Sequence, residues 1–203
     1  MESIDIDQAV YLKSALLRWA SAMEKAAPEL NERDAQLGDG DLGVTLEKCA
    51  KNVIAALDKE TSCPYEIFKN VSQACADASG SSFGTLLTSG FFATAKWLQE
   101  GKDLDRNSLS ELLNHIVQKL SKRGGASLGD KTMLDSLHAI SIAIENCGDQ
   151  EDLSEVALRG ARKAIEDFRN QPNKIGRARM FAEKTIGLDD PGMVAVLRMV
   201  ESI

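Results

Sequence analysis

Three aspartates lie close together near the start of the chain, on a segment that is also rich in glycine. Asp34, Asp39 and Asp41 belong to the stretch NERDAQLGDGDLGVT, residues 31–45. Glycine permits backbone angles that other residues resist, so short carboxylates on such a turn can converge on one point. Convergent Asp oxygens with no histidine or cysteine nearby suit a hard cation such as Mg²⁺. The pattern therefore predicts a magnesium site formed by these three carboxylates.

The same segment allows two other interpretations. A single Asp-Gly dipeptide is most often a polar turn or a helix N-cap, but three aspartates in this spacing favour the metal. A calcium EF-hand is excluded: counting from Asp39, the fifth position is Gly43 and the twelfth is Ala50, so the acidic ligands of that loop are missing.

Composition bounds the class of protein. The chain has 203 residues, 43% hydrophobic and 27% charged, which predicts one globular domain spanning residues 1–203. The net charge of −7 and the lack of a large basic cluster argue against a nucleic-acid partner. There is no apolar run long enough to cross a membrane, and the acidic start is unlike an export signal.

Cysteine and histidine usage narrows the chemistry further. Four cysteines lie far apart with no CxxC pair, which predicts reduced thiols and a cytoplasmic location. The two histidines, His115 and His138, both fall in helical patterns. This leaves no basis for a histidine-rich metal site or for a Ser-His-Asp triad with a choice of bases.

Apolar residues recur at helical spacing along nearly the whole chain, which predicts an all-α protein of eight helices. We expect the first helix to end near Pro28, the fifth to open with a capping box from Ser108 to Glu111, and the sixth to start near Asp130. The predicted ranges, read from the apolar positions, are about 4–27, 46–57, 64–78, 86–98, 108–120, 130–144, 153–168 and 193–200.

Short connections predict antiparallel neighbours in an up-and-down arrangement. The loops before the second, fourth, sixth and eighth helices then share one end, and these are the unusual loops, at 37–43, 79–85, 123–132 and 173–192. Their glycines and hydroxyls precede helix N-termini, which carry unpaired N–H groups and attract phosphate. A cation between carboxylates and phosphate explains both halves of such a site. Met133 could form an apolar wall for a base and Arg177 could contact phosphate, although core packing and a surface charge are the simpler interpretations of each.

Four segments form distinctive motifs: LNERDAQLGDGDLG at 30–43, SGSSFGTLL at 79–87, RGGASLGDKTMLD at 123–135 and GRARMFAEKTIGLDDPG at 176–192. With these motifs, nearly the whole chain resembles the nucleotide-binding L subunit (DhaL, or DAK2-type domain) of dihydroxyacetone kinases. The resemblance implies an eight-helix antiparallel up-and-down barrel with the nucleotide site at one end. It implies that the three aspartates hold two Mg²⁺ ions. The implied ADP/ATP contacts are Leu42, Gly43, Val44, Thr45, Ser81, Ser82, Gly124, Met133, Arg177, Asp190, Pro191 and Gly192.

The resemblance also implies a phosphotransferase that needs a partner. In the family, a histidine of a separate substrate-binding K subunit or domain holds the ketose, so no catalytic residue is assigned to this chain. The donor is either ATP or a phosphotransferase-system protein that rephosphorylates bound ADP. This chain has Leu42 where the family often has histidine, which leaves open another small ketose as substrate. The alternatives are a non-catalytic nucleotide sensor and a plain helical interaction module, the latter leaving the four loops unexplained.

Overall fold

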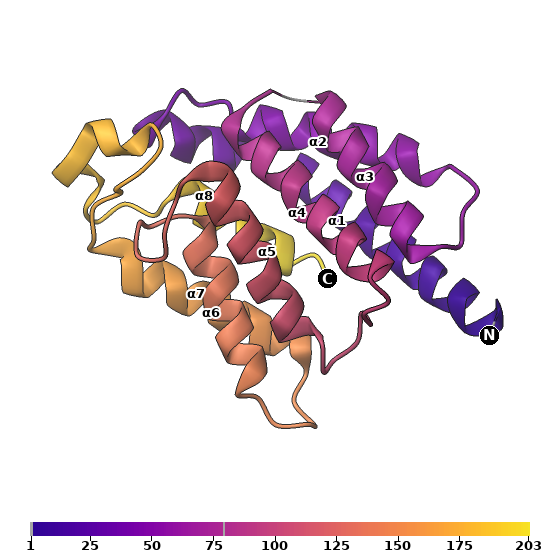
Figure 1. Ribbon diagram of the computed structural model, residues 1–203. Helices are drawn as coiled ribbons and strands as arrows, with labels where there is room; N and C mark the ends of the chain where they lie inside the picture. The colour runs from indigo at the N-terminus through magenta and orange to yellow at the C-terminus, as the bar shows by residue number, and fades with distance from the viewer. Residues whose placement is uncertain (1, 79) are drawn as a thin grey trace.

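Helices make up most of the structure (Figure 1). The computed structural model describes the backbone of residues 2–78 and 80–203, and the side chains of residues 8–78 and 80–203. Across these residues the chain forms α-helices and no strand, as the helical periodicity predicts. The elements in chain order are α1 (Glu2–Leu37), α2 (Leu42–Leu57), α3 (Pro64–Ala78), α4 (Ser82–Gln99), α5 (Leu109–Gly124), α6 (Met133–Glu145), α7 (Leu153–Arg169), the 3₁₀ segment η1 (Ala178–Thr185) and α8 (Pro191–Val200).

The α-helices form a closed ring. Each helix packs against the next one along the chain, and α8 returns to pack against α1 as well as α7. This is the antiparallel up-and-down barrel that the sequence predicts. In such a ring the connections α1–α2, α3–α4, α5–α6 and α7–α8 lie at one end. Figure 1 shows η1, the unexpected helical turn inside the α7–α8 connection, at the left edge beyond the bundle.

Two large apolar clusters and a small third one, around Leu12, Phe68 and Ala95, fill the interior. The larger one joins α1, α2 and α3 to α8, with Leu30, Leu46 and Val71 among its fully buried members. The second joins α5 and α6 to α7 and α8. Apolar residues at helical spacing on each element supply one inward face, so the ring closes by burying those faces together.

The expected end of the first helix near Pro28 was wrong. α1 continues through this proline to Leu37, which places Asp34 on its last turn. A proline inside a helix costs about 3 kcal/mol. The residues beyond it recover that cost, because Leu30 and Leu37 are both buried and each contributes about 1.5–3 kcal/mol. Pro28 itself is exposed.

Two expectations about helix starts also need correction. Ser108 does not cap α5 with its side chain, because its hydroxyl donates to the carbonyl of Asp103, 2.9 Å away, and contacts Asp105. A capping box occurs instead at α6, which begins at Met133 rather than near Asp130. There Thr132 Oγ1 accepts from Leu134 N at 3.2 Å, and the carboxylate of Asp135 accepts from Thr132 N at 2.8 Å. This box fixes the start of the helix that carries Met133 into the site.

Candidate functional site

The four unusual connections surround one cleft, as the parity of the helices predicts. The cleft has a volume of about 1110 Å³ and is lined by residues from all four connections and from the helices that follow them. The N-termini of α2, α4, α6 and α8 open onto it. Residue 79, the first of the predicted 79–85 loop, lies outside the described residues.

The three predicted metal ligands meet in this cleft. Asp34 comes from the last turn of α1, whereas Asp39 and Asp41 come from the short connection to α2. One carboxylate oxygen of each lies within 4.8 Å of the others. Asp34 is half-buried and Asp39 and Asp41 are exposed to the cleft. Three convergent, all-oxygen ligands of this kind fit Mg²⁺.

The predicted metal ligands Asp34, Asp39 and Asp41 are called the metal-ligand cluster below. Asp34 also connects this cluster to the start of α2. Its Oδ2 accepts hydrogen bonds from the backbone N–H groups of Asp41 at 3.0 Å and Leu42 at 3.4 Å. Asn31 adds a third contact, because its Oδ1 accepts from Val44 N at 3.1 Å. These side chains of α1 therefore take up N–H groups at the first turn of α2 that the sequence alone would offer to phosphate.

Two glycines in this region are required by close approach. A Cβ at Gly38 would lie 2.5 Å from Asp34 Oδ1, so a side chain there would displace the carboxylate of this predicted metal ligand. A Cβ at Gly43 would lie 1.9 Å from the carbonyl oxygen of Ala27. Gly43 thus faces the α1 backbone and is the one predicted nucleotide residue that does not line the cleft.

Basic side chains share the cleft with the carboxylates. Arg177, just before η1, forms an ion pair with Asp39. The sequence assigned a contact role only to Arg177, and the lining contains three further basic residues, Lys48, Arg123 and Arg179. Lys48 lies four residues after Val44 on α2, so helical spacing from the predicted site could have found it.

Hydroxyl and carboxylate caps fix the other helix starts. Ser81 Oγ accepts from Gly84 N at 3.0 Å at the start of α4, and Thr45 Oγ1 reaches the same hydroxyl at 3.1 Å from α2. Asp190 Oδ1 accepts from Met193 N at 3.0 Å at the start of α8, and its Oδ2 accepts from Asn173 Nδ2 at 2.8 Å. Burial is the main cause that raises the pKa of Asp190 to about 6.

The remaining wall of the cleft is apolar. Met133 contributes to this wall and also packs in the second core cluster, so the two interpretations of this residue are compatible. Phe83 and Leu86 from α4 lie along the same wall. A Cβ at Gly124 would come within 3.1 Å of Leu86 Cδ2, so glycine keeps that side open. Apolar walls of this kind are common in small-molecule sites.

Most of the predicted site residues therefore come together. The cleft lining includes Asp34, Asp39, Asp41, Leu42, Val44, Thr45, Ser81, Ser82, Gly124, Met133, Arg177, Asp190, Pro191 and Gly192. The two histidines lie elsewhere, as predicted. His115 on α5 packs its ring 5.6 Å from that of Trp97, and burial lowers its pKa, whereas His138 lies on α6. Neither lines the cleft.

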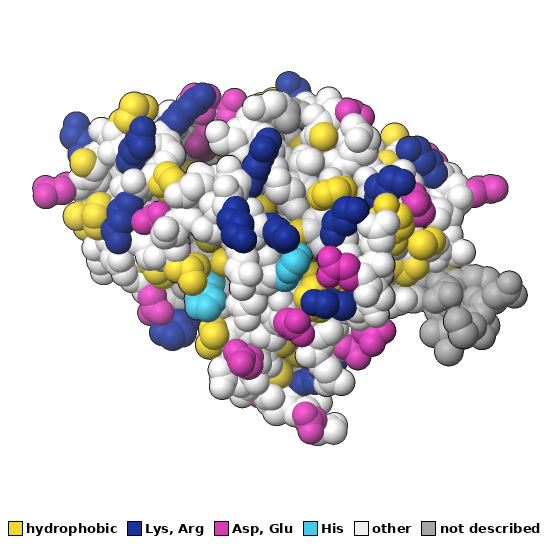
Figure 2. All heavy atoms as spheres, in the orientation of Figure 1, with side chains coloured by type: hydrophobic (Ala, Val, Ile, Leu, Met, Phe, Trp, Pro, Cys, Tyr) yellow, Lys and Arg dark blue, Asp and Glu magenta, His cyan; other side chains and the backbone are white. Residues whose placement is uncertain are grey.

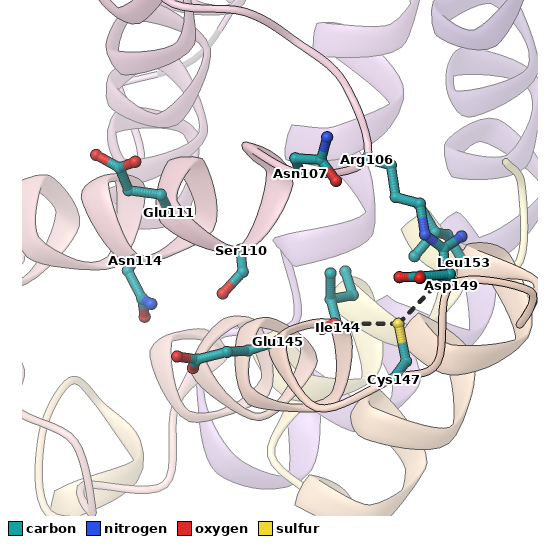
Figure 3. A pocket seen from close by; sticks show the side chains of 10 residues that line it. All are labelled: Arg106, Asn107, Ser110, Glu111, Asn114, Ile144, Glu145, Cys147, Asp149 and Leu153. Atoms are coloured by element: carbon teal, nitrogen blue, oxygen red, sulfur yellow. Dashed lines mark hydrogen bonds between the residues drawn. The ribbon is translucent and has the colours of Figure 1, made fainter.

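A second, smaller cleft of about 430 Å³ lies between α5 and the α6–α7 connection (Figure 3). Arg106 is engaged there with the backbone, because it donates to the carbonyls of Gly148 at 2.6 Å and Glu151 at 2.9 Å. Among the described residues, the acidic side chains of this cleft form no cluster that could hold a metal ion. The larger cleft is therefore the candidate site.

A ring of helices that gathers carboxylates and four helix N-termini at one end is the arrangement of a metal-assisted phosphate-binding domain. The family model for the DAK2 domain matches residues 36–203, and the chain belongs to this family. The matched region contains the whole candidate site except Asp34.

Named relatives and solved structures agree with this assignment. The chain is 26% identical over 187 residues to the ADP-binding subunit DhaL of PEP-dependent dihydroxyacetone kinase 1 of Listeria innocua, covering 90% of both chains. It is 28% identical over 185 residues to the L-erythrulose kinase of Pectobacterium atrosepticum, covering 86% of this chain and 31% of that one. The crystal structure of the dihydroxyacetone kinase of C. freundii with AMP-PNP and Mg²⁺ matches 95% of this chain and 33% of that chain, with a TM-score of 0.75 and 21% identity.

The chain thus spans about a third of the length of the erythrulose kinase but nine-tenths of the Listeria subunit. The structural match, at its low identity, supports the fold. Of the helices in the described part of the chain, none is both long enough and apolar enough to span a bilayer.

Proposed function

We propose that residues 1–203 form a single nucleotide-binding domain that acts as the ADP/ATP- and magnesium-binding subunit of a small-ketose kinase. The observation that carries this proposal is the cleft itself, where three convergent carboxylates face basic side chains and helix N-termini. A site with carboxylates alone would repel phosphate. A phosphate site formed by basic residues alone would have no use for the carboxylates. A nucleotide whose phosphates are bridged by metal accounts for both sets of residues.

Asp34, Asp39 and Asp41 would hold two Mg²⁺ ions, which neutralise and orient the phosphate oxygens when bound. The chain's own groups then complete the site. Arg177 contacts Asp39 and lies where it can reach a terminal phosphate. Met133 and its apolar neighbours would hold the base. Leu42, Val44, Thr45 and the segments at 81–82 and 190–192 would contact the phosphates and ribose. Catalysis of this kind rests on positioning and charge stabilisation.

The ketose would be held by a partner, the substrate-binding K subunit, which docks over the open end of the cleft. The rim is suited to a protein surface: Met180 is 73% exposed on η1, and Phe181 follows it. Figure 2 shows Lys and Arg side chains gathered at the upper left, where η1 lies, with apolar side chains between them. Arg179 and Lys184 are exposed on this segment. Such a mixed rim favours a partner with an acidic face.

Relatives named as dihydroxyacetone kinase subunits and as an L-erythrulose kinase support a three- or four-carbon ketose as the acceptor. The Listeria relative's name includes PEP, which supports a phosphotransferase-system protein as donor, with ATP as the alternative. All four cysteines are free thiols, which supports the cytoplasmic location expected from the sequence. A non-catalytic nucleotide sensor is the second candidate, favoured by Leu42 at the position where histidine is usual.

The test is phosphoryl transfer with purified chain, Mg²⁺, ATP and dihydroxyacetone or erythrulose, with and without a K subunit. We expect no ketose phosphate from the lone chain and turnover when the K subunit is added. Turnover by the lone chain that is lost in His115→Ala or His138→Ala would overturn the subunit assignment. ADP binding without any transfer in the presence of K subunits active with other L subunits would favour the sensor.

A further inference from the structure

Lys131 is a lysine with 1% of its surface exposed, in the connection just before α6. Its ammonium group donates to three backbone carbonyls: Arg169 at 3.1 Å, Gln171 at 2.8 Å and Thr185 at 2.9 Å. Arg169 ends α7, Gln171 lies in the connection that follows, and Thr185 ends η1. All three ammonium hydrogens are thus engaged, which compensates for removing the charge from water.

The backbone of Lys131 carries a second set of contacts. Its carbonyl accepts from Asn173 Nδ2 at 2.9 Å, and the same amide nitrogen donates to Asp190 Oδ2 at 2.8 Å. Asp190 is the N-cap of α8. Lys131 therefore connects the end of α7, η1 and the start of α8, while the next residue, Thr132, caps α6.

Backbone strain is concentrated in this same network. Among the described non-glycine residues, only Lys131 and Ala182 have positive φ, at 63° and 47°. The carbonyl of Ala182 accepts from Thr185 Oγ1 at 2.7 Å, and that hydroxyl in turn accepts from Asn173 N at 2.8 Å. Such conformations cost about 1–3 kcal/mol each and persist only where surrounding contacts hold them. Strain of this kind clusters at functional sites.

The segments joined by Lys131 make up one wall of the cleft. Met133 follows the α6 cap, residues 175–180 lead into η1, and residues 190–192 start α8, and all of them line the cleft. The carboxylates of the metal-ligand cluster line the same cleft from the junction of α1 and α2, and one of them, Asp39, pairs with Arg177 of this wall. Lys131 itself does not line the cleft. It can therefore influence a bound nucleotide only through the position of the segments that it holds.

We propose that Lys131 is a positioning residue for the nucleotide site, holding the α6–η1–α8 wall at the separation from the metal-ligand cluster that a metal-bridged nucleotide requires. The inference rests on the proposed function. A residue that served stability alone would not need to hold together the three cleft-lining segments that come from different parts of the chain. Lys131 also bears on the position of Arg177. Arg177 pairs with Asp39, and it belongs to the segment whose far end Lys131 holds at Thr185.

The test compares Lys131→Met with Val71→Ala. Lys131→Met keeps most of the apolar stem but removes the ammonium donors. Val71 is fully buried on α3, a helix that contributes nothing to the cleft lining, so Val71→Ala lowers stability without altering the site. ADP affinity is measured by calorimetry in Mg²⁺, at a temperature where denaturation curves show each variant to be fully folded.

We expect Lys131→Met to weaken ADP binding at least fivefold relative to Val71→Ala, whose affinity stays within twofold of wild type. A smaller difference would overturn the positioning role. If Lys131→Met does not fold, Lys131→Gln replaces it, since its shorter amide cannot donate to all three carbonyls that the ammonium holds. For Lys131→Gln a loss of at least threefold supports the role, and a smaller loss overturns it. Absence of ADP binding by the wild type would instead refute the proposed function.

Discussion

Gly43 provides a sharp test of how the metal-ligand cluster is assembled. A Cβ at this position would lie 1.9 Å from Ala27 O and 2.8 Å from Ala27 Cα, and both are backbone atoms. Atoms pack best at about 3.5–4.0 Å, so α1 and α2 would have to move apart by more than about 1 Å in Gly43→Ala. No side-chain rotation can relieve the contact.

The expected cost is at the upper end of overpacking, about 3 kcal/mol. For a domain of this size that lowers the melting temperature by about 6–12 °C. Because the separation moves Asp34 on α1 away from Asp39 and Asp41, Mg²⁺-dependent ADP binding should weaken as well. Thermal denaturation and calorimetry measure the two effects.

Gly90 is the matched control, since it also lies within a helix but has room for a side chain. Its Cβ would meet only Ile116 Cγ2, at 3.8 Å, which is an ordinary contact. Gly90→Ala should therefore stabilise α4 by about 0.8–1 kcal/mol through helix propensity and leave ADP binding unchanged. If Gly43→Ala melted within about 2 °C of Gly90→Ala, the argument from close helix approach would be refuted.

Three further predictions follow from the cleft. Asp39→Ala should abolish tight ADP binding in Mg²⁺, and calorimetry that showed an unchanged affinity for ADP would refute the metal assignment. ADP with Mg²⁺ should stabilise the wild type by about 2.7 kcal/mol at a hundredfold excess over Kd, seen as a higher melting temperature that EDTA reverses; no shift at millimolar ADP would count against a nucleotide site. The pKa of Asp190, about 6, lies above its ordinary value of 3.8, so the folded state binds this proton more tightly and the stabilisation is lost as the pH rises through 6. From pH 5 to 7.5 the free energy of unfolding of the wild type should fall by about 1.4 kcal/mol relative to Asp190→Asn, measured by denaturant titration, and a constant difference would contradict the raised pKa.

The sequence by itself determined which end of the molecule carries the site. Helical periodicity set the number of α-helices, and the parity of an up-and-down ring placed four distinctive connections together. The spacing of Asp34, Asp39 and Asp41 was enough to predict that they converge. These conclusions hold because they depend on local spacing and on the order of the elements, both of which can be read along the chain.

Only the tertiary structure decided how the site is held in place. Local signals indicated a helix end at Pro28, but burial of Leu37 carries α1 onward and puts Asp34 on a rigid turn. Gly43 reads as part of a phosphate loop, yet its role is set by Ala27 on another helix. Lys131 lies within one of the distinctive connections, but its role cannot be read there, because its partners lie 38 to 54 residues away. Contacts between segments so far apart depend on helix packing, which spacing along one segment does not encode.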